Sequence, residues 1–211
     1  MRWQDLLRLV GAEPVFSSAL LLAGPTSLPR VRLQLSRWVR ARRLLRLRRG
    51  VYMLAEPWRK VESHPFTVAN ALQRGSYVSL QAALSFHGLI PEHVPVVTSI
   101  GPGRPETLRT PLGGFQFNHL VARQLFGYAL IDVAPGQRAF VAGPEKALLD
   151  LVYLTPGGDD PAFLESLRLQ QLDVIHPATL VALAERSGKP RLRRAASRTL
   201  DLLRHDIGVR L

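Results

Sequence analysis

The chain has 211 residues, of which 46% are apolar, enough to bury the core of one or two compact domains without covalent crosslinks. It contains no cysteine, which excludes disulfide bonds and thiolate metal sites and is typical of the reducing cytoplasm. The formal net charge is +12 and is unevenly distributed, because residues 1–54 hold eleven arginines against Asp5 and Glu13, a net charge of +9.

This concentration of arginine is typical of a protein that binds a polyanion, and arginine in preference to lysine favours forked contacts with phosphates and guanine edges. A helix lying on a membrane surface is the competing explanation. We rank it lower, because the basic residues continue beyond a helix into a hairpin. The sequence also predicts no signal peptide and no membrane span: Asp5 and Arg8 interrupt the first helix, and the apolar run 15–23 is too short. We therefore expect a cytoplasmic protein.

Two helices are predicted at the start of the chain. Apolar residues recur at helical spacing over residues 3–10, and Gly11 follows as a stop signal. A second, short helix is expected at residues 19–22, and Gly24-Pro25 ends it. These two elements precede the basic part of the chain.

A third helix is predicted over residues 28–39, with Thr26 and Ser27 as its capping residues. Its apolar positions recur every three or four residues, as a core-facing stripe requires. The same spacing leaves a polar set together on another face, made of Arg30, Gln34 and Arg37.

The period changes from helical to two after Ala41. Leucine alternates with arginine over residues 45–48, so the leucines are expected on one face of a strand and the arginines on the other. Arg49-Gly50 supplies a turn, and residues 51–54 are β-prone enough to form the returning strand.

The order helix, turn, helix, hairpin predicts an N-terminal winged helix-turn-helix that binds double-stranded DNA, with the third helix in the major groove and the hairpin on the flanking backbone or minor groove. The plainer alternative is a basic helix and hairpin whose arginines are only solvated. The predicted DNA-binding residues are Ser27, Arg30, Arg32, Gln34, Arg37, Arg40, Arg46, Arg48 and Arg49.

The rest of the chain predicts a second domain, of mixed α/β type and ending in helices, so the fold class is α+β with domains at residues 1–56 and 64–211. Strand patterns occur at residues 77–79, 94–100, 108–112, 115–119, 129–133 and 138–141. Helical patterns occur at residues 66–74, 80–87, 144–154, 162–169, 178–187 and 192–204.

Three stretches carry a resemblance to a known family. They are LRRGVY at residues 47–52, YVSLQAALSFHGL at residues 77–89 and PEKALLDL at residues 144–151. In sequence, order and spacing they resemble the AbiEi family, the antitoxins and transcriptional repressors of bacterial AbiE-type toxin–antitoxin systems.

The resemblance implies repression of the protein's own operon at inverted repeats in its promoter, with self-association on DNA as one way to occupy two half-sites. It also implies neutralisation of a toxin that resembles nucleotidyltransferases, by direct contact or indirectly. Composition and periodicity predict only the nucleic-acid-binding module.

The sequence predicts no catalytic site, no cofactor and no metal site. Hydrolase elbow, zinc-protease and phosphate-loop motifs are absent, and the histidines lack the spacing of a metal site. The alternative function is a metal-dependent nuclease with a winged-helix targeting domain, supported only by Glu145 and Asp150 on one helix. Their spacing puts them on different sides of that helix, so we expect Asp150 to be a structural hydrogen-bond acceptor. A protein-interaction module that does not bind DNA is a third class.

A second basic cluster lies near the C-terminus, on the last two helices and the turn between them. It is either a solvated face or an auxiliary contact with DNA or with an acidic toxin surface. The candidate residues are Lys189, Arg191, Arg193, Arg194 and Arg198.

Overall fold

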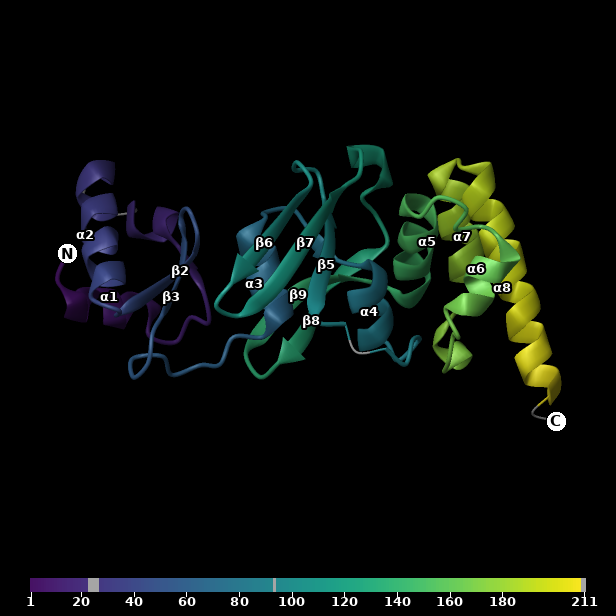
Figure 1. Cartoon of the computed structure of the whole chain (residues 1–211), viewed down its shortest axis with the longest axis horizontal. Helices are drawn as coiled ribbons and strands as arrows, with labels where there is room; N and C mark the ends of the chain where they lie inside the picture. The colour runs from purple at the N-terminus through teal and green to yellow at the C-terminus, as the bar shows by residue number, and fades with distance from the viewer. Residues whose placement is uncertain (23–26, 93, 210–211) are drawn as a thin grey trace.

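The computed structural model describes residues 1–22, 27–92 and 94–209. As the sequence predicts, the fold is mixed α+β, with eight α-helices and two sheets in these residues. The molecule is elongated: the N-terminal elements lie at one end, the larger sheet lies in the middle, and the C-terminal helices lie at the opposite end (Figure 1).

The N-terminal elements occur in the predicted order, with one strand that the sequence does not reveal. Strand β1 is only two residues long, too short for an alternating pattern, and it pairs with β3 to give the sheet order β1-β3-β2. The expected helix end at Gly24-Pro25 and the cap at Thr26 lie outside the described residues. The elements are α1 (Trp3–Val10), β1 (Phe16–Ser17), η1 (Ser18–Leu22), α2 (Leu28–Arg40), β2 (Leu44–Arg48) and β3 (Val51–Leu54).

The apolar stripe of α2 forms a small core with α1 and one face of the hairpin β2–β3. Val31, Leu35 and Trp38 of α2 are buried in it, as helical spacing predicts. Trp3 lies edge-on to Trp38, with ring centroids 5.2 Å apart. This packing holds α2 against the hairpin and leaves its other faces outside the core.

The second sheet has six strands in the order β6-β7-β5-β4-β9-β8. The hairpins β6–β7 and β8–β9 are antiparallel, as predicted. The strand patterns 108–112 and 115–119 leave residues 113–114 for the first turn, whereas the turn is Pro111-Leu112 and both glycines belong to β7. Strand β5 pairs with β7 and β4 with β9 in parallel. These elements are α3 (Pro65–Leu72), β4 (Tyr77–Val78), α4 (Leu80–Phe86), β5 (Val96–Gly101), β6 (Glu106–Thr110), β7 (Gly113–His119), η2 (Ala122–Gln124), β8 (Tyr128–Ala134) and β9 (Gln137–Ala142).

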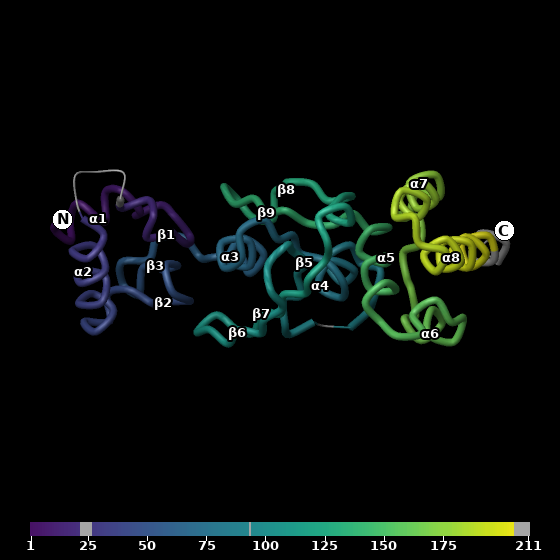
Figure 2. The backbone as a smooth tube through the Cα atoms, turned by 90° about the horizontal axis from the view of Figure 1, so that it is seen from above, coloured from purple at the N-terminus to yellow at the C-terminus, as the bar shows by residue number. Residues whose placement is uncertain are grey.

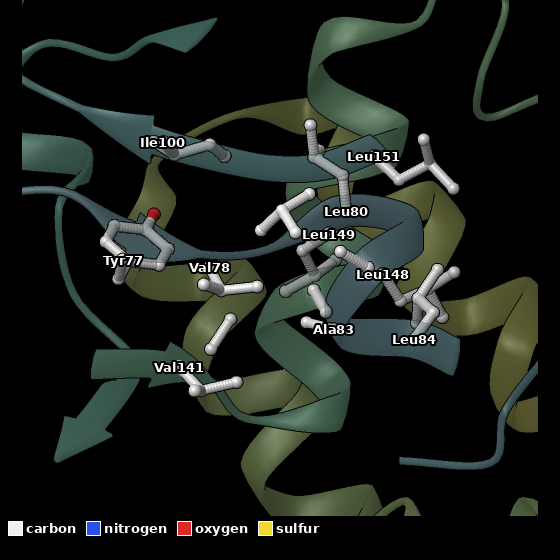
Figure 3. Packing of buried hydrophobic residues seen from close by; sticks show 14 of the residues in the cluster. Tyr77, Val78, Leu80, Ala83, Leu84, Ile100, Val141, Leu148, Leu149 and Leu151 are labelled. Atoms are coloured by element: carbon white, nitrogen blue, oxygen red, sulfur yellow. The ribbon is translucent and has the colours of Figure 1, made fainter. Parts of the chain in front are cut away.

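Helix α5 (Pro144–Leu154) joins the sheet to the helical end of the molecule. Both views place it between the sheet and the last helices (Figures 1 and 2). Its buried leucines pack with Leu80, Ala83 and Leu84 of α4 in the main core (Figure 3). The remaining elements are α6 (Pro161–Ser166), η3 (Leu172–Val174), α7 (Pro177–Ser187) and α8 (Pro190–Val209).

The two parts of the chain share hydrophobic contacts. Strand β3 ends at Leu54 and α3 begins at Pro65, where the sequence places the boundary between its two predicted domains. However, Leu47, Val51 and Met53 of the hairpin belong to the main core together with the second sheet. The hairpin is therefore covered on one face by the N-terminal helices and on the other by the second part of the chain.

None of the helices in the described residues combines the length and apolar character needed to cross a membrane.

A candidate nucleic-acid interface

A basic groove lies between α2 and the hairpin β2–β3. Its volume is about 1150 Å³, and it is lined by both elements. No acidic residue is among the described residues that line it. The arginines that line it are Arg32, Arg40, Arg42, Arg46, Arg48 and Arg49.

Helix α2 divides its polar residues between two sides. Arg32, Ser36 and Arg40 follow one another at intervals of four residues and line the groove. The predicted reading set, Arg30, Gln34 and Arg37, does not line it; Arg30 and Arg37 are exposed, and Gln34 is half-buried. The geometry thus offers the groove side and the outer side of α2 as two separate contact faces.

Ser27 is the N-cap residue of α2 by position, but its side chain makes no capping hydrogen bond. The backbone carbonyl of Ser27 accepts a hydrogen bond from the Val31 amide, 3.1 Å away, which begins the helix. Ser27 is exposed at the positive end of the helix dipole, a position that suits a phosphate contact.

A β-bulge in β2 decides where the hairpin arginines point. Arg46 lies opposite Tyr52, on the face that packs toward the N-terminal core, and Arg48 lies opposite Val51, on the other face. Leu47 is the extra residue between them, and an extra residue breaks the alternation of a strand. The prediction that the arginines of residues 45–48 share one face is therefore wrong for Arg48. Its side chain lies on the face that packs toward the main core, as those of Leu45 and Leu47 do.

Arg48 joins the hairpin to the second part of the chain. Its Nη1 donates to the Leu72 carbonyl oxygen, 2.6 Å away at the end of α3, and to Glu106 Oε1, 2.7 Å away on β6. The Gln73 side-chain amide donates to the same carboxylate oxygen at 3.3 Å. Arg48 can contact DNA only with the donors that remain, so we assign it to the contact between the two parts of the chain.

The other arginines of this surface are not neutralised by the protein. In the described residues, no carboxylate lies within 4.0 Å of them. Unpaired guanidinium groups on one surface repel one another, and a bound polyanion relieves that repulsion. The set is Arg30, Arg32, Arg37, Arg40, Arg42, Arg46 and Arg49.

Arg42 is a groove residue that sequence reasoning missed. It is exposed and has a left-handed backbone, with φ of +53°, where α2 gives way to β2. Its neighbour Arg43 points inward, with its guanidinium carbon 5.4 Å from the Trp3 ring centroid. The two adjacent arginines Arg42-Arg43 could have indicated a basic contact here. However, neither helical nor strand periodicity determines the direction of side chains where a helix joins a strand.

A second, smaller cleft continues from the tip of the hairpin. Its volume is about 590 Å³, and it shares Ser18, Arg48, Arg49 and Gly50 with the groove. The second part of the chain contributes Arg74, Arg104 and Glu106 to its lining. Arg49 therefore lies between the groove and the second cleft and is exposed to both.

The C-terminal basic cluster is largely compensated by the protein's own acceptors. Arg194 donates two hydrogen bonds to Asp159 Oδ2, at 2.9 and 2.7 Å, and these lower the pKa of Asp159. Arg193 pairs with Glu185 at 2.9 Å, and Arg191 donates to the carbonyls of Tyr153 and Thr155.

The two remaining members of the cluster differ from these. Lys189 Nζ lies 5.9 Å from the Tyr153 ring centroid, and Arg198 is half-buried. The whole cluster lies at the opposite end of the molecule from α2 (Figure 1). It therefore does not extend the groove.

The carboxylates of α5 are used inside the protein. Asp150 is 1% exposed and accepts from Lys146 Nζ at 2.6 Å, Ser79 Oγ at 2.8 Å and Tyr77 OH at 3.0 Å. Burial raises the pKa of Asp150, and the ammonium group of Lys146 opposes that rise. Asp150 is thus a structural acceptor, as its position on the helix predicts.

Glu145 is buried as well, and its Oε1 accepts from the His176 backbone amide at 2.7 Å. Within the described ranges, no three His, Cys, Asp or Glu side chains gather in a way that could hold a metal ion. Two of the stretches that carry the family resemblance meet at this network, because Tyr77 and Ser79 belong to one and Asp150 to the other.

Neither the models of known protein families nor the curated proteins match this chain.

Proposed function

We propose that this protein is a cytoplasmic, sequence-specific DNA-binding repressor of its own operon and the antitoxin of a toxin–antitoxin pair, without catalytic activity. The observation that carries the DNA-binding part is the groove between α2 and the hairpin, which is lined by arginines and by no acidic residue in the described part of the chain. Neutralising DNA phosphates with such groups releases counterions and supplies most of the binding free energy at moderate salt.

In this proposal α1, η1 and α2 form the helix-turn-helix and β2–β3 is the wing. Helix α2 enters the major groove, where Arg32 and Arg40 on the groove side, or Arg30 and Arg37 on the outer side, meet base edges and phosphates. The wing contributes Arg46 and the exposed Arg49. Arg48 is left out of the DNA surface, because its guanidinium group bonds to Leu72 and Glu106.

The antitoxin part of the proposal rests on the motif resemblance alone. It assigns to the second domain a cognate toxin that resembles nucleotidyltransferases, neutralised by contact or indirectly. Inverted repeats in the promoter would be occupied by two copies of the protein, either as a dimer or as monomers that associate on DNA.

The test is binding of the full chain to its own promoter. Affinity would be measured by fluorescence anisotropy at several salt concentrations, against a duplex of the same length and scrambled sequence. Arg32→Ala and Arg40→Ala on the groove side would be compared with Arg30→Ala and Gln34→Ala. A bidentate base contact contributes about 1–3 kcal/mol of discrimination between base pairs. Variants on the side of α2 that contacts the bases are therefore expected to lose that much of the preference for the promoter over the scrambled duplex.

Arg123→Ala is the matched control, because it removes an exposed arginine of η2, outside the groove. The proposal fails if the wild-type protein binds neither duplex at moderate salt. The major-groove assignment fails if all four helix variants keep the wild-type preference for the promoter.

A further inference from the structure

Leu33 is an apolar side chain in the middle of the basic helix α2. It is 54% exposed, the largest exposed fraction among the large hydrophobic residues in the described part of the chain. A leucine of the core stripe would be buried, as Val31 and Leu35 on the same helix are. Leu33 therefore contributes little to the core and is available for contact with a partner outside the chain.

The neighbours of Leu33 on the helix surface restrict the chemistry of that partner. Residues three, four and seven positions away lie beside it on an α-helix. In the described residues, the arginines among them have no carboxylate within 4.0 Å. The neighbours within the described residues are Pro29, Arg30, Ser36, Arg37 and Arg40, so three of the five are arginines.

The partner must therefore offer an apolar group within a strongly anionic surface. An apolar protein surface would leave these guanidinium groups buried without partners, which is costly. The major groove of DNA meets both requirements, because the 5-methyl group of thymine projects into it between two rows of phosphates. Both views place α2 at the end of the molecule, with the hairpin between it and the second sheet (Figures 1 and 2).

We propose that Leu33 is a specificity-determining residue that contacts the 5-methyl group of thymine in the bound DNA. This inference rests on the proposed function, since it requires that α2 lies in the major groove. Leu33 supplies discrimination that the arginines cannot, because guanidinium groups hydrogen-bond to guanine and phosphate and do not select a methyl group.

The test removes that methyl group alone. A duplex selected by the full-length protein from random sequence would be remade with 2′-deoxyuridine in place of each thymine in turn. Wild-type protein is expected to lose about fourfold in affinity at one or two thymines, since burying one methyl group is worth about 0.8 kcal/mol. Leu33→Ala is expected to bind the thymine duplex more weakly and to show no loss on deoxyuridine substitution at those positions.

Two controls make the result specific. Leu9→Ala removes a 48% exposed leucine from α1 and is expected to keep the full response to deoxyuridine. Leu33→Ala is expected to fold as the wild type does, because the side chain is exposed and alanine is the best helix former.

The possible outcomes separate this inference from the proposed function. If wild-type protein binds the duplex but no thymine position responds to deoxyuridine, the role of Leu33 is wrong while DNA binding stands. The same holds if Leu33→Ala responds as strongly as wild type. If no duplex is selected at all, the proposed function fails first.

Discussion

Arg48 Nη1 lies 2.7 Å from Glu106 Oε1, and this contact joins the N-terminal hairpin to β6 across 58 residues of sequence. The Arg48 side chain is 32% exposed and the Glu106 side chain 29% exposed, so water screens the ion pair only in part. The same guanidinium group also donates to the carbonyl at the end of α3. The contact supplements the apolar packing of Leu47, Val51 and Met53 against the second part of the chain.

Arg48→Ala is expected to lower the free energy of unfolding by about 1–3 kcal/mol, because it leaves Glu106 and the Leu72 carbonyl without this donor. Urea denaturation would measure the loss. Arg49→Ala is the matched control, since Arg49 is exposed and has no carboxylate within 4.0 Å in the described residues. Equal losses for the two variants would show that the contact does not stabilise the fold.

For DNA binding, the two variants are expected to exchange roles, so that Arg49→Ala has an effect and Arg48→Ala has none. If Arg49 contacts one phosphate, Arg49→Ala is expected to reduce the slope of log affinity against log salt concentration by about 0.9. Arg48→Ala is expected to leave that slope unchanged, because Arg48 bonds within the protein. The measurement is a salt titration of promoter binding. A reduced slope for Arg48→Ala with no change for Arg49→Ala would reverse our assignment of the two residues.

Lys146→Met is expected to destabilise the fold by about 3–5 kcal/mol, because it leaves the buried carboxylate of Asp150 without its cation. Asp150→Asn is expected to be destabilising as well, because it leaves the buried ammonium group of Lys146 without its carboxylate. Asp201→Asn breaks an exposed pair with Arg204 and is expected to change stability by less than about 1 kcal/mol.

The nuclease alternative makes a different prediction for Asp150. It requires that Asp150→Asn abolishes cleavage of labelled promoter DNA in Mg²⁺ or Mn²⁺ while the fold stays intact. Incubation of wild-type protein with the metal and DNA tests that alternative directly, and cleavage that depends on Asp150 would overturn the non-catalytic proposal.

His64 is expected to make the fold less stable in mild acid. Burial lowers the pKa of His64 below 6.5, and its neutral Nδ1 accepts a hydrogen bond from the Phe66 amide, 3.2 Å away, at the start of α3. A folded-state pKa below the unfolded value means that the neutral form favours folding. Stability is thus fully present above about pH 6.5 and is lost as the pH falls through the folded-state pKa.

The measurement for His64 is the free energy of unfolding at several pH values between 8 and 5. His64→Asn keeps a capping side chain without a titrating group, so its stability is expected to fall less than that of the wild type over this range. Parallel curves for the two proteins would show that another group is responsible.

Much of the fold follows from local pattern. Helix α1 has the predicted bounds, α5 begins at Pro144 as expected, and the hairpin β8–β9 turns at Pro135-Gly136. Strand β1 and the parallel pairing of β5 with β7 were not predicted. A two-residue strand carries no period, and parallel partners are chosen by contacts between distant segments that no local window contains.

The candidate site, too, could be predicted only in part from the sequence. Helical spacing correctly predicts that Val31, Leu35 and Trp38 of α2 are buried, but Leu28 at the start of the same stripe is exposed. The spacing also does not indicate which polar side of the helix faces the hairpin. The bulge at Leu47 turns Arg48 to the opposite face, and the left-handed backbone at Arg42 accompanies the split between Arg42 and Arg43. Each change is a local backbone irregularity that composition does not reveal.

By itself, the sequence determined where the charge is concentrated and the order of the helices and the longer strands, because both depend on neighbouring residues. The tertiary structure decided which arginines remain available to a partner. Arg48 and Arg194 meet carboxylates that are far away in the chain, whereas Arg32, Arg40 and Arg46 surround a groove with no acidic residue among its described lining. Only folding brings a guanidinium group and its acceptor within bonding distance, so availability is a property of the fold.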